Sequence, residues 1–285
     1  MKKVFAQAYI WLVLFLMYLP ILILIAFSFT EATNVGEWTG FSFNLYPKLF
    51  KDVELMTALG NTLLLAFISA IVSVILGTMG AIGAFYSKRR TRNVIDTVTQ
   101  IPIVNAEIVM ALSLVVLFVF VGNVIFKHNI FSFWTLLIGH VVLSLPFVYT
   151  NIKPKLQQMD PHLYEAALDL GATPRQALWK VIIPECAPGI LSGFLLAITL
   201  SLDDFIITAF TRGSGLLSGD SQIETLSTLV QAKLKKGPIP VEMRALTTII
   251  FIIVIIAVIC ITIYKNKTAS HKKVRRREIA WVINS

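Results

Sequence analysis

Three long runs of the chain contain no charged residue, and this feature limits the possible folds more than any other. The runs extend from Val4 to Thr30, from Gly60 to Tyr86 and from Ala245 to Tyr264. A helix needs roughly 20 apolar residues to cross the hydrocarbon core of a bilayer, and each run is that long. With 56% hydrophobic and only 14% charged residues, the 285-residue chain has too little charge for the surface of a soluble domain of this length.

Three further apolar runs contain isolated ionisable residues: 101–126 holds Glu107, 133–150 holds His140, and 190–210 holds two adjacent aspartates. We therefore predict one all-α integral membrane domain over residues 1–285. Its six transmembrane helices are expected at about 8–29, 59–86, 101–126, 133–150, 188–210 and 246–264. The first run is too long for the apolar part of a signal peptide, and no small-residue cleavage pattern follows it, so we expect it to be retained.

The distribution of basic residues predicts the orientation. If the N-terminus is cytoplasmic, the cytoplasmic segments hold 17 of the 25 Lys and Arg residues. Positive charge concentrates on the cytoplasmic side of membrane proteins. We therefore predict that the chain crosses the cell membrane several times and that both of its termini are cytoplasmic. The tail 265–285 contains "KKVRRRE", which beside a membrane favours anionic lipid headgroups over nucleic acid as its partner.

The sequence shows no arrangement of residues typical of a catalytic site or a metal centre. Cys186 and Cys260 are far apart and form no CxxC or Cys/His arrangement, so neither a disulfide framework nor a metal site is indicated. No nucleophile and base fall into a recognisable catalytic arrangement. The chain has no Gly-Lys dipeptide and hence no Walker A phosphate loop. We predict no enzyme activity and no cofactor in this chain.

The longest predicted cytoplasmic loop, residues 151–189, carries consistent helix signals. Asp160 can cap a first helix with Pro161 at its first position, and Gly171 can end that helix. Thr173 and Gln176 then form a capping box for a second helix, which we expect to end at Pro184. Isolated helices of about ten residues are marginal in water, so the pair is expected to dock on a partner.

The same loop resembles the EAA loop of ABC-importer permeases. The resemblance rests on Glu165, Ala166 and Ala167, then Gly171 and, after nine residues, "VIIP" ending at Pro184. It implies the type I importer permease fold, with this loop as the coupling helix element that docks in a cleft of a separate ATPase subunit, where ATP and Mg²⁺ would bind. An amphipathic helix pair lying on the membrane surface is the alternative, but it would not require a glycine at this spacing.

The two aspartates, Asp203 and Asp204, interrupt the apolar stretch "TLSLDDFIITAF". A carboxylate inside a membrane is costly, by roughly 2.5–3.5 kcal/mol on insertion scales, and usually faces a cavity or a charged partner. In a continuous helix Asp204 shares a face with Ser201, whereas Asp203 points about 100° away. One aspartate could therefore line a path while the other pairs with a neighbouring subunit, and a purely structural role remains an alternative.

Along continuous helices, Asp203 would lie roughly 20 Å from the cytoplasmic end of its span and Glu107 roughly 9 Å from the end of its own. Carboxylates at two depths would suit a polycation moving inward. A structural role is also an alternative for Glu107. For His140 we expect no more than packing or an interhelical hydrogen bond.

The stretches "EIVMALSLVVLF", "SLPFVYT", "EAALDLGA" and "TLSLDDFIITAF" resemble PotC-like permeases of spermidine/putrescine importers, and the likeness runs from about Trp11 to Tyr264. It implies inward polyamine transport, with Glu107, Ser201, Asp203 and Asp204 on the substrate pathway. It also implies three kinds of partner: an ATPase dimer, a second permease and an extracytoplasmic polyamine-binding protein. External aromatics such as Trp38 and Tyr46 could stack on ammonium groups. Permeases of this kind tend to have a tryptophan beside the position of Tyr46, whereas this chain has Leu45 there.

Other functions remain open at this stage. A permease for another cationic or small solute shares every feature above. An ion-coupled secondary transporter would need inverted repeats and broken helices, and no repeat is visible in the sequence. Outside the spans we expect a Gly/Ser-rich loop over "TRGSGLLSGDSQ" and a short external helix over "IETLSTLVQAKLKKG".

Overall fold

The computed structural model describes residues 2–32, 36–215, 219–236, 240–253 and 255–256. Helices make up nearly all of the described chain, which confirms the all-α prediction. Within these described ranges, five helical segments are long and apolar enough to cross a membrane: Phe5–Phe27, Val53–Tyr86, Glu107–Phe126, Phe133–Gln158 and Pro174–Asp203. The sixth predicted span, 246–264, runs past the described residues, which are helical over 242–253. The basic tail and Cys260 lie outside the described residues.

The chain divides into two compact units, residues 1–53 with 236–285 and residues 54–235. The first unit contains α1 (Lys2–Phe27) and α2 (Leu45–Lys51). Its two chain segments are joined where the Arg244 guanidinium donates a hydrogen bond of 2.8 Å to the Ala32 carbonyl. Leu45 and Leu49 of α2 are fully buried, so α2 is held by its apolar face.

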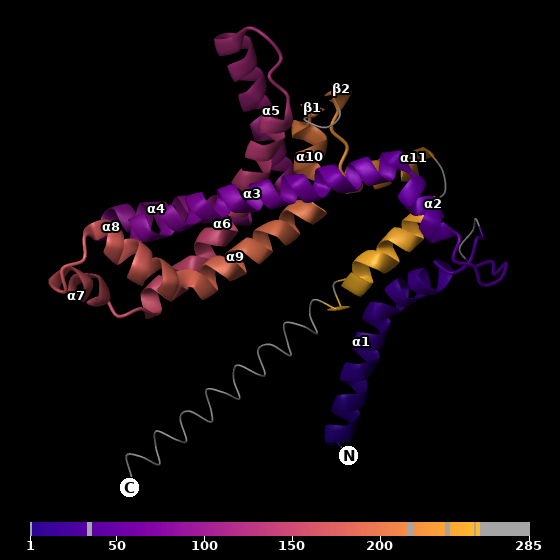
Figure 1. Ribbon diagram of the computed structural model, residues 1–285, viewed down its shortest axis with the longest axis horizontal. Helices are drawn as coiled ribbons and strands as arrows, with labels where there is room; N and C mark the ends of the chain where they lie inside the picture. Colours follow the sequence, from indigo (N-terminus) through magenta and orange to yellow (C-terminus); the bar gives the residue numbers. More distant parts are fainter. Residues whose placement is uncertain (1, 33–35, 216–218, 237–239, 254, 257–285) are drawn as a thin grey trace. The chain divides into compact units, whose positions relative to one another are not determined.

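The second unit holds the other labelled helices, α3 to α11, and a small hairpin (Figure 1), whereas the helical residues 242–253 belong to the first unit. Its elements, in order, are α3 (Val53–Tyr86), α4 (Arg89–Val104), α5 (Glu107–Val121), the π-helical turn η1 (Gly122–Phe126), α6 (Phe133–Gln158), α7 (Leu163–Asp169), α8 (Pro174–Ala177), the π-helical turn η2 (Leu178–Ile182), α9 (Ile183–Asp203), α10 (Ile206–Thr211), β1 (Ser214–Gly215), β2 (Gly219–Gln222) and α11 (Leu226–Lys236). The external helix predicted over 223–237 corresponds to α11, whereas part of the predicted Gly/Ser-rich loop pairs as the antiparallel hairpin β1–β2.

The core of this unit is built where α6 packs between α3 and α9, and small residues let these backbones approach. A Cβ atom added to Gly77 of α3 would lie 2.8 Å from Cγ1 of Val148, and one added to Gly193 of α9 would lie 3.2 Å from Cα and Cγ1 of the same valine. Val148 is therefore clamped between two glycines, as expected where packing drives helix association in lipid. Gly83, which looks equivalent to Gly77 in sequence, has open space around it.

Two of the predicted spans are broken, and both breaks occur next to acidic residues. The span expected over 101–126 is divided between α4, which ends at Val104, and α5, which begins at Glu107. Asn105 and Ala106 between them have extended backbones, with ψ angles of 144° and 135°. The span expected over 188–210 ends at Asp203, where Asp204 is extended with ψ 123° and α10 follows as a separate helix.

The prediction that the second loop helix ends at Pro184 is wrong. The helix that begins at Pro174 continues through η2 into α9, so Pro174–Asp203 is one helical run of 30 residues. Pro184 is the second residue of α9 and follows the π-helical turn by two positions. A proline inside a continuous helix removes one i→i−4 hydrogen bond, and the π-helical turn just before Pro184 interrupts the i→i−4 pattern at this place, so the helix can continue past the proline.

Candidate functional site

The break between α9 and α10 is organised by the Asp204 side chain. Its carboxylate accepts hydrogen bonds from the backbone N–H groups of Ile207, at 3.2 Å, and Thr208, at 2.9 Å. It also accepts a bond of 3.1 Å from the Thr208 hydroxyl. These are the free N–H groups at the start of α10, so Asp204 acts as the cap of that helix. The cap explains why the chain leaves the helix at this aspartate.

His140 of α6 connects this cap to two more helices. One ring nitrogen, Nδ1, lies 2.8 Å from the Ser201 hydroxyl of α9, and the other, Nε2, lies 2.9 Å from the Thr208 hydroxyl and 3.5 Å from the Asp204 carboxylate. Ser69 of α3 donates to the Ser201 hydroxyl at 3.1 Å. The side chains of His140 and Asp204 are 0% and 1% exposed. We call these five residues the buried polar network. The interhelical role expected for His140 is present, with more partners than expected.

Asp203 lies in a different environment from its neighbour. Its side chain is exposed in the isolated chain and makes no hydrogen bond or ion pair with any other described residue. Asp204 and Ser201 are both buried, in agreement with the shared helix face predicted for them. Asp204, however, has an extended backbone and is not part of the helix. The structure thus shows a buried Asp204 next to an exposed Asp203.

Glu107 is placed at the other break, as the first residue of α5. It is exposed, and its position in the first helical turn suits a carboxylate because the free N–H groups there carry partial positive charge. The half-helices that follow the two breaks pack on each other, through a cluster of Met110, Ala111, Leu114 and Phe118 of α5, Leu143 of α6 and Ile207 of α10. The depth expected for Glu107 in a continuous span therefore does not apply, because the helix is broken just before it, whereas α9 runs unbroken from Ile190 to Asp203.

In the loop predicted to couple to an ATPase, the short helix α7 is joined to the start of the long Pro174–Asp203 helix by a turn at Gly171, which has a φ of +87°. The Ala172 N–H donates to the Ala167 carbonyl at 3.0 Å and the Gly171 N–H donates to the Leu168 carbonyl at 2.8 Å, the pair of bonds that defines a Schellman end. The predicted capping box is also present, between Thr173 and Gln176. Asp160 accepts from the His162 N–H, but α7 begins only at Leu163, two residues later than a Pro161 start would imply.

The residues of this loop divide into a buried and an exposed set. Ala167 is buried against its own chain, whereas Glu165 and Ala166 are exposed. Leu170 is 90% exposed and Trp179 is 68% exposed. The loop therefore presents a carboxylate, a small residue and two large apolar side chains outward.

The aromatic residues of the first unit form a cluster rather than separate stacking platforms. The Phe29 ring lies 5.4 Å from Phe41, 5.6 Å from Phe43 and 6.0 Å from Tyr46. The Tyr46 hydroxyl is within 3.1 Å of the Ser28 hydroxyl. Trp38 remains 57% exposed. Of the two aromatics considered for cation–π contacts, Trp38 is thus the more accessible.

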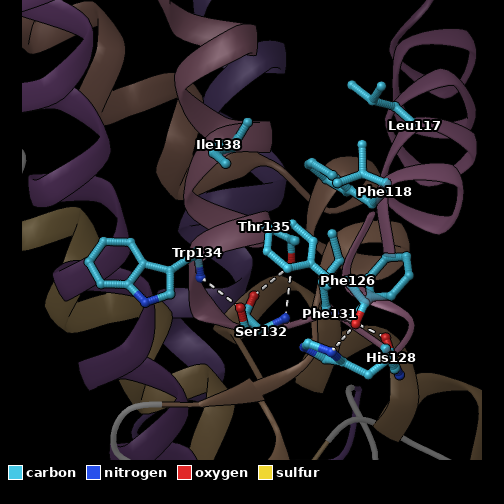
Figure 2. A pocket seen from close by; sticks show the side chains of 12 residues that line it. Leu117, Phe118, Phe126, His128, Phe131, Ser132, Trp134, Thr135 and Ile138 are labelled. Carbon is cyan, nitrogen blue, oxygen red and sulfur yellow. Dashed lines mark hydrogen bonds between the residues drawn. The ribbon is translucent and has the colours of Figure 1, made fainter. Parts of the chain in front are cut away.

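A cavity that sequence reasoning missed lies between the end of α5 and the start of α6 (Figure 2). Its volume is about 600 Å³, and Phe118, Phe126, Phe131 and Trp134 contribute aromatic rings to its wall. No aspartate or glutamate is among the described residues that line it. The local signal that could have located it is the Ser132 capping box, which starts α6 immediately beside the aromatic side chains.

Together, the apolar helices, the broken spans and the exposed loop define a membrane permease. The family described as the inner membrane component of binding-protein-dependent transport systems matches residues 73–276. The chain belongs to this family and is accordingly a multi-pass membrane component of a transport system and not an enzyme, as predicted.

Relatives and solved structures agree with this assignment. The chain is 34% identical over 247 residues to the spermidine/putrescine transport system permease protein PotC of Haemophilus influenzae, covering 87% of this chain and 91% of the relative. It is 34% identical over 235 residues to the putrescine transport system permease protein PotI of Escherichia coli K12, covering 82% and 81%. A bacterial ABC transporter involved in the import of the acidic polysaccharide alginate has a similar fold, with a TM-score of 0.66 at 16% identity over 93% of this chain and 95% of that chain. This confirms the predicted ABC-importer permease fold.

Proposed function

We propose that this chain is one of two membrane subunits of an ATP-driven importer, and that its cargo is a polyamine, spermidine or putrescine. The names of the PotC and PotI relatives support this cargo. The other subunits in this proposal are a second permease, a dimer of ATPase subunits that bind ATP and Mg²⁺, and an extracytoplasmic binding protein. Both termini lie on the cytoplasmic side, as the distribution of basic residues favours.

The observation that carries the proposal is an exposed carboxylate at each of two helix breaks, Glu107 before α5 and Asp203 at the end of α9. A charged side chain in a membrane protein is retained when it faces a path or a charged partner. A carboxylate at the start of α5 and another at the end of α9 can bind two ammonium groups of one flexible cation. Anionic solutes would be repelled by the same pair.

The two aspartates take different roles in this mechanism. Asp203, exposed and without a partner among the described residues, contacts the cargo. Asp204, held by two backbone N–H groups and lying near His140, keeps α10 in position and is not available to the cargo. Ser201 belongs with Asp204, because its hydroxyl is used by His140 and Ser69. Both are positioning residues.

Coupling to ATP hydrolysis is assigned to the loop 151–189. Leu170 and Trp179 supply exposed apolar surface, and Glu165 supplies a charge for a basic or hydroxyl partner on the ATPase. Trp179 lies on the helix that continues through Pro184 into α9 and ends at Asp203, and the turn at Gly171 joins Glu165 and Leu170 to the start of that helix. Movement of the loop can therefore reach the break along one helix.

The experiment is uptake by proteoliposomes that contain the full complex with its binding protein. We expect ATP-dependent entry of labelled spermidine and putrescine and no entry of sulfate. The Glu107→Gln and Asp203→Asn variants should assemble normally and transport poorly. ATP-independent uptake driven by an ion gradient through this chain alone would contradict the importer assignment, and ATP-driven uptake of a different cation in place of polyamines would contradict the cargo.

A further inference from the structure

The start of helix α11 is held on α3 by side chains of α3 (Figure 1). The Leu226 N–H, at the first position of α11, donates a hydrogen bond of 2.8 Å to the Thr62 hydroxyl. Just before the helix, the Glu224 carbonyl accepts a bond of 3.0 Å from the Asn61 side-chain amide. Thr62 and Asn61 are both buried. The free N–H groups that begin a helix are thus satisfied here in part by a different helix.

The residues on either side of this start are anchored as well. Ile223 is buried in a cluster of side chains that includes Leu65 of α3, and Leu229 is also buried. Farther along α11, the Lys233 ammonium lies 2.8 Å from the Glu54 carboxylate near the start of α3. Burial of the two apolar side chains contributes more than an ion pair near the surface. We therefore expect α11 to move together with α3.

From this position, α11 reaches the break between α9 and α10. The Ser227 hydroxyl donates a hydrogen bond of 2.8 Å to the backbone carbonyl of Asp204. In a continuous helix this carbonyl would accept from the Thr208 N–H, but that N–H donates to the Asp204 carboxylate instead. The Thr208 hydroxyl lies farther from the carbonyl, at 3.5 Å. Ser227 therefore supplies the partner that the break has taken away.

The three polar groups of Asp204 are each bound by a different helix. Its N–H donates to the Leu200 carbonyl of α9 at 3.2 Å, and its carboxylate accepts from the first N–H groups of α10. Its carbonyl accepts from Ser227 of α11. Asp203 directly precedes this residue at the end of α9. The orientation of the backbone beside Asp203 therefore depends on α11 as well as on α10.

We propose that α11 is a positioning element for Asp203, and that Ser227 is the positioning residue through which it acts. A side chain that is ordered before binding loses less entropy when its partner arrives. The buried polar network holds the side chain of Asp204, whereas α11 holds the main chain of the same residue from outside the span. The expected effect on cargo binding rests on the proposed cargo role of Asp203, but the effect on the geometry of the break does not.

The first test measures the break itself and needs no cargo. In the intact complex, with Cys186 and Cys260 replaced by alanine, Asp203→Cys is labelled with a small cationic methanethiosulfonate reagent and the rate is followed by mass spectrometry. Adding Ser227→Ala should raise the labelling rate roughly twofold to tenfold, the range that corresponds to the net contribution of one hydrogen bond. Ser227→Thr keeps the hydroxyl and should restore most of the original rate. A purely structural role would leave the rate unchanged well below the unfolding temperature.

Thr62→Val loosens the same link at its other end, because it removes the hydroxyl that accepts from the Leu226 N–H and keeps the shape of the side chain. It should also raise the labelling rate, and its effect together with Ser227→Ala should be less than additive. Ser87→Ala is the matched control, since it removes a serine hydroxyl that donates to the Gly83 carbonyl at 2.6 Å, just past the opposite end of α3. It should leave the rate unchanged.

The second test measures uptake by the full complex. Ser227→Ala should raise the KM for spermidine roughly twofold to tenfold with a smaller change in kcat, and Ser227→Thr should restore it. Faster labelling with an unchanged KM would support the role of α11 and contradict the cargo role of Asp203. Unchanged labelling in both Ser227→Ala and Thr62→Val would overturn the proposal, whatever the uptake. If the Ser227→Ala complex fails to assemble, the labelling rate of Thr62→Val decides.

Discussion

Asp203 and Asp204 are adjacent in the chain but face opposite environments, since the Asp204 side chain is 1% exposed and lies 3.5 Å from Nε2 of His140, whereas Asp203 is exposed. The same substitution at the two positions should therefore give different defects. Asp203→Asn keeps the size of the side chain and removes its charge. We expect normal complex yield and a tenfold or larger loss of spermidine uptake, because a charge-assisted contact contributes about 1.5–3 kcal/mol. Putrescine, with one fewer amine, should be affected less.

Asp204→Asn should damage the fold before it affects cargo binding. An amide has one acceptor oxygen and would point an N–H₂ group at the donors that the second carboxylate oxygen now accepts from Thr208. Leaving such donors unsatisfied costs about 1–3 kcal/mol. A lower unfolding temperature in detergent, measured by intrinsic fluorescence, is the expected result. Full stability together with lost uptake would show that Asp204 contacts the cargo after all.

His140 is expected to be a stability determinant of the same network. His140→Leu removes both ring nitrogens, so the Ser201 and Thr208 hydroxyls each lose one partner and keep their bonds to Ser69 and Asp204. We expect a loss of about 1–2 kcal/mol, at the upper end of what hydrogen bonds between membrane helices contribute. The unfolding midpoint of the purified complex measures it. In the Ser201→Ala background the same change should cost less, and strictly additive losses would argue against a shared network.

Two glycines of α3, Gly77 and Gly83, should respond differently to substitution by alanine, and a second substitution should restore the stability lost at Gly77. Gly77→Ala places a Cβ atom 2.8 Å from Val148 Cγ1, so it should destabilise the unit, and Val148→Ala should restore much of the loss by making room. Gly83→Ala is the matched control, because nothing lies within 4 Å of its added Cβ atom. It should be neutral or stabilising by about 0.5–1 kcal/mol, as alanine is the better helix former. Equal damage from both alanine variants would contradict the clamp around Val148.

The turn at Gly171 should be sensitive to backbone conformation and not to side-chain size. No atom lies within 4 Å of a Cβ added there, but its φ of +87° is a conformation that branched residues avoid. Gly171→Leu should therefore reduce ATPase co-purification and ATP-driven uptake, whereas Gly171→Asn should retain more of both because asparagine tolerates positive φ. Glu165→Ala should weaken docking less than the leucine variant. Normal ATPase binding by Gly171→Leu would exclude this loop as the coupling element.

The membrane class, the approximate positions of the long helices, and the Gly171 turn and capping box of the loop 151–189 were determined by sequence alone, whereas the helix end predicted at Pro184 was wrong. Each depends on residues close together in the chain: a run such as 60–86 is apolar whatever it packs against, and the capping box of Thr173 and Gln176 needs only its own turn. The Schellman end at Gly171 is local in the same way. Such signals do not change with tertiary context.

Only the tertiary structure decided where helices break and which acid is buried. Asp204 leaves its helix because it can cap α10 while lying beside His140, which is 64 positions earlier in the chain. Likewise, Gly77 matters and Gly83 does not because only Gly77 faces Val148 of α6. Sequence periodicity places such residues on a face, but the partner across that face comes from another helix, and its identity depends on how the helices pack.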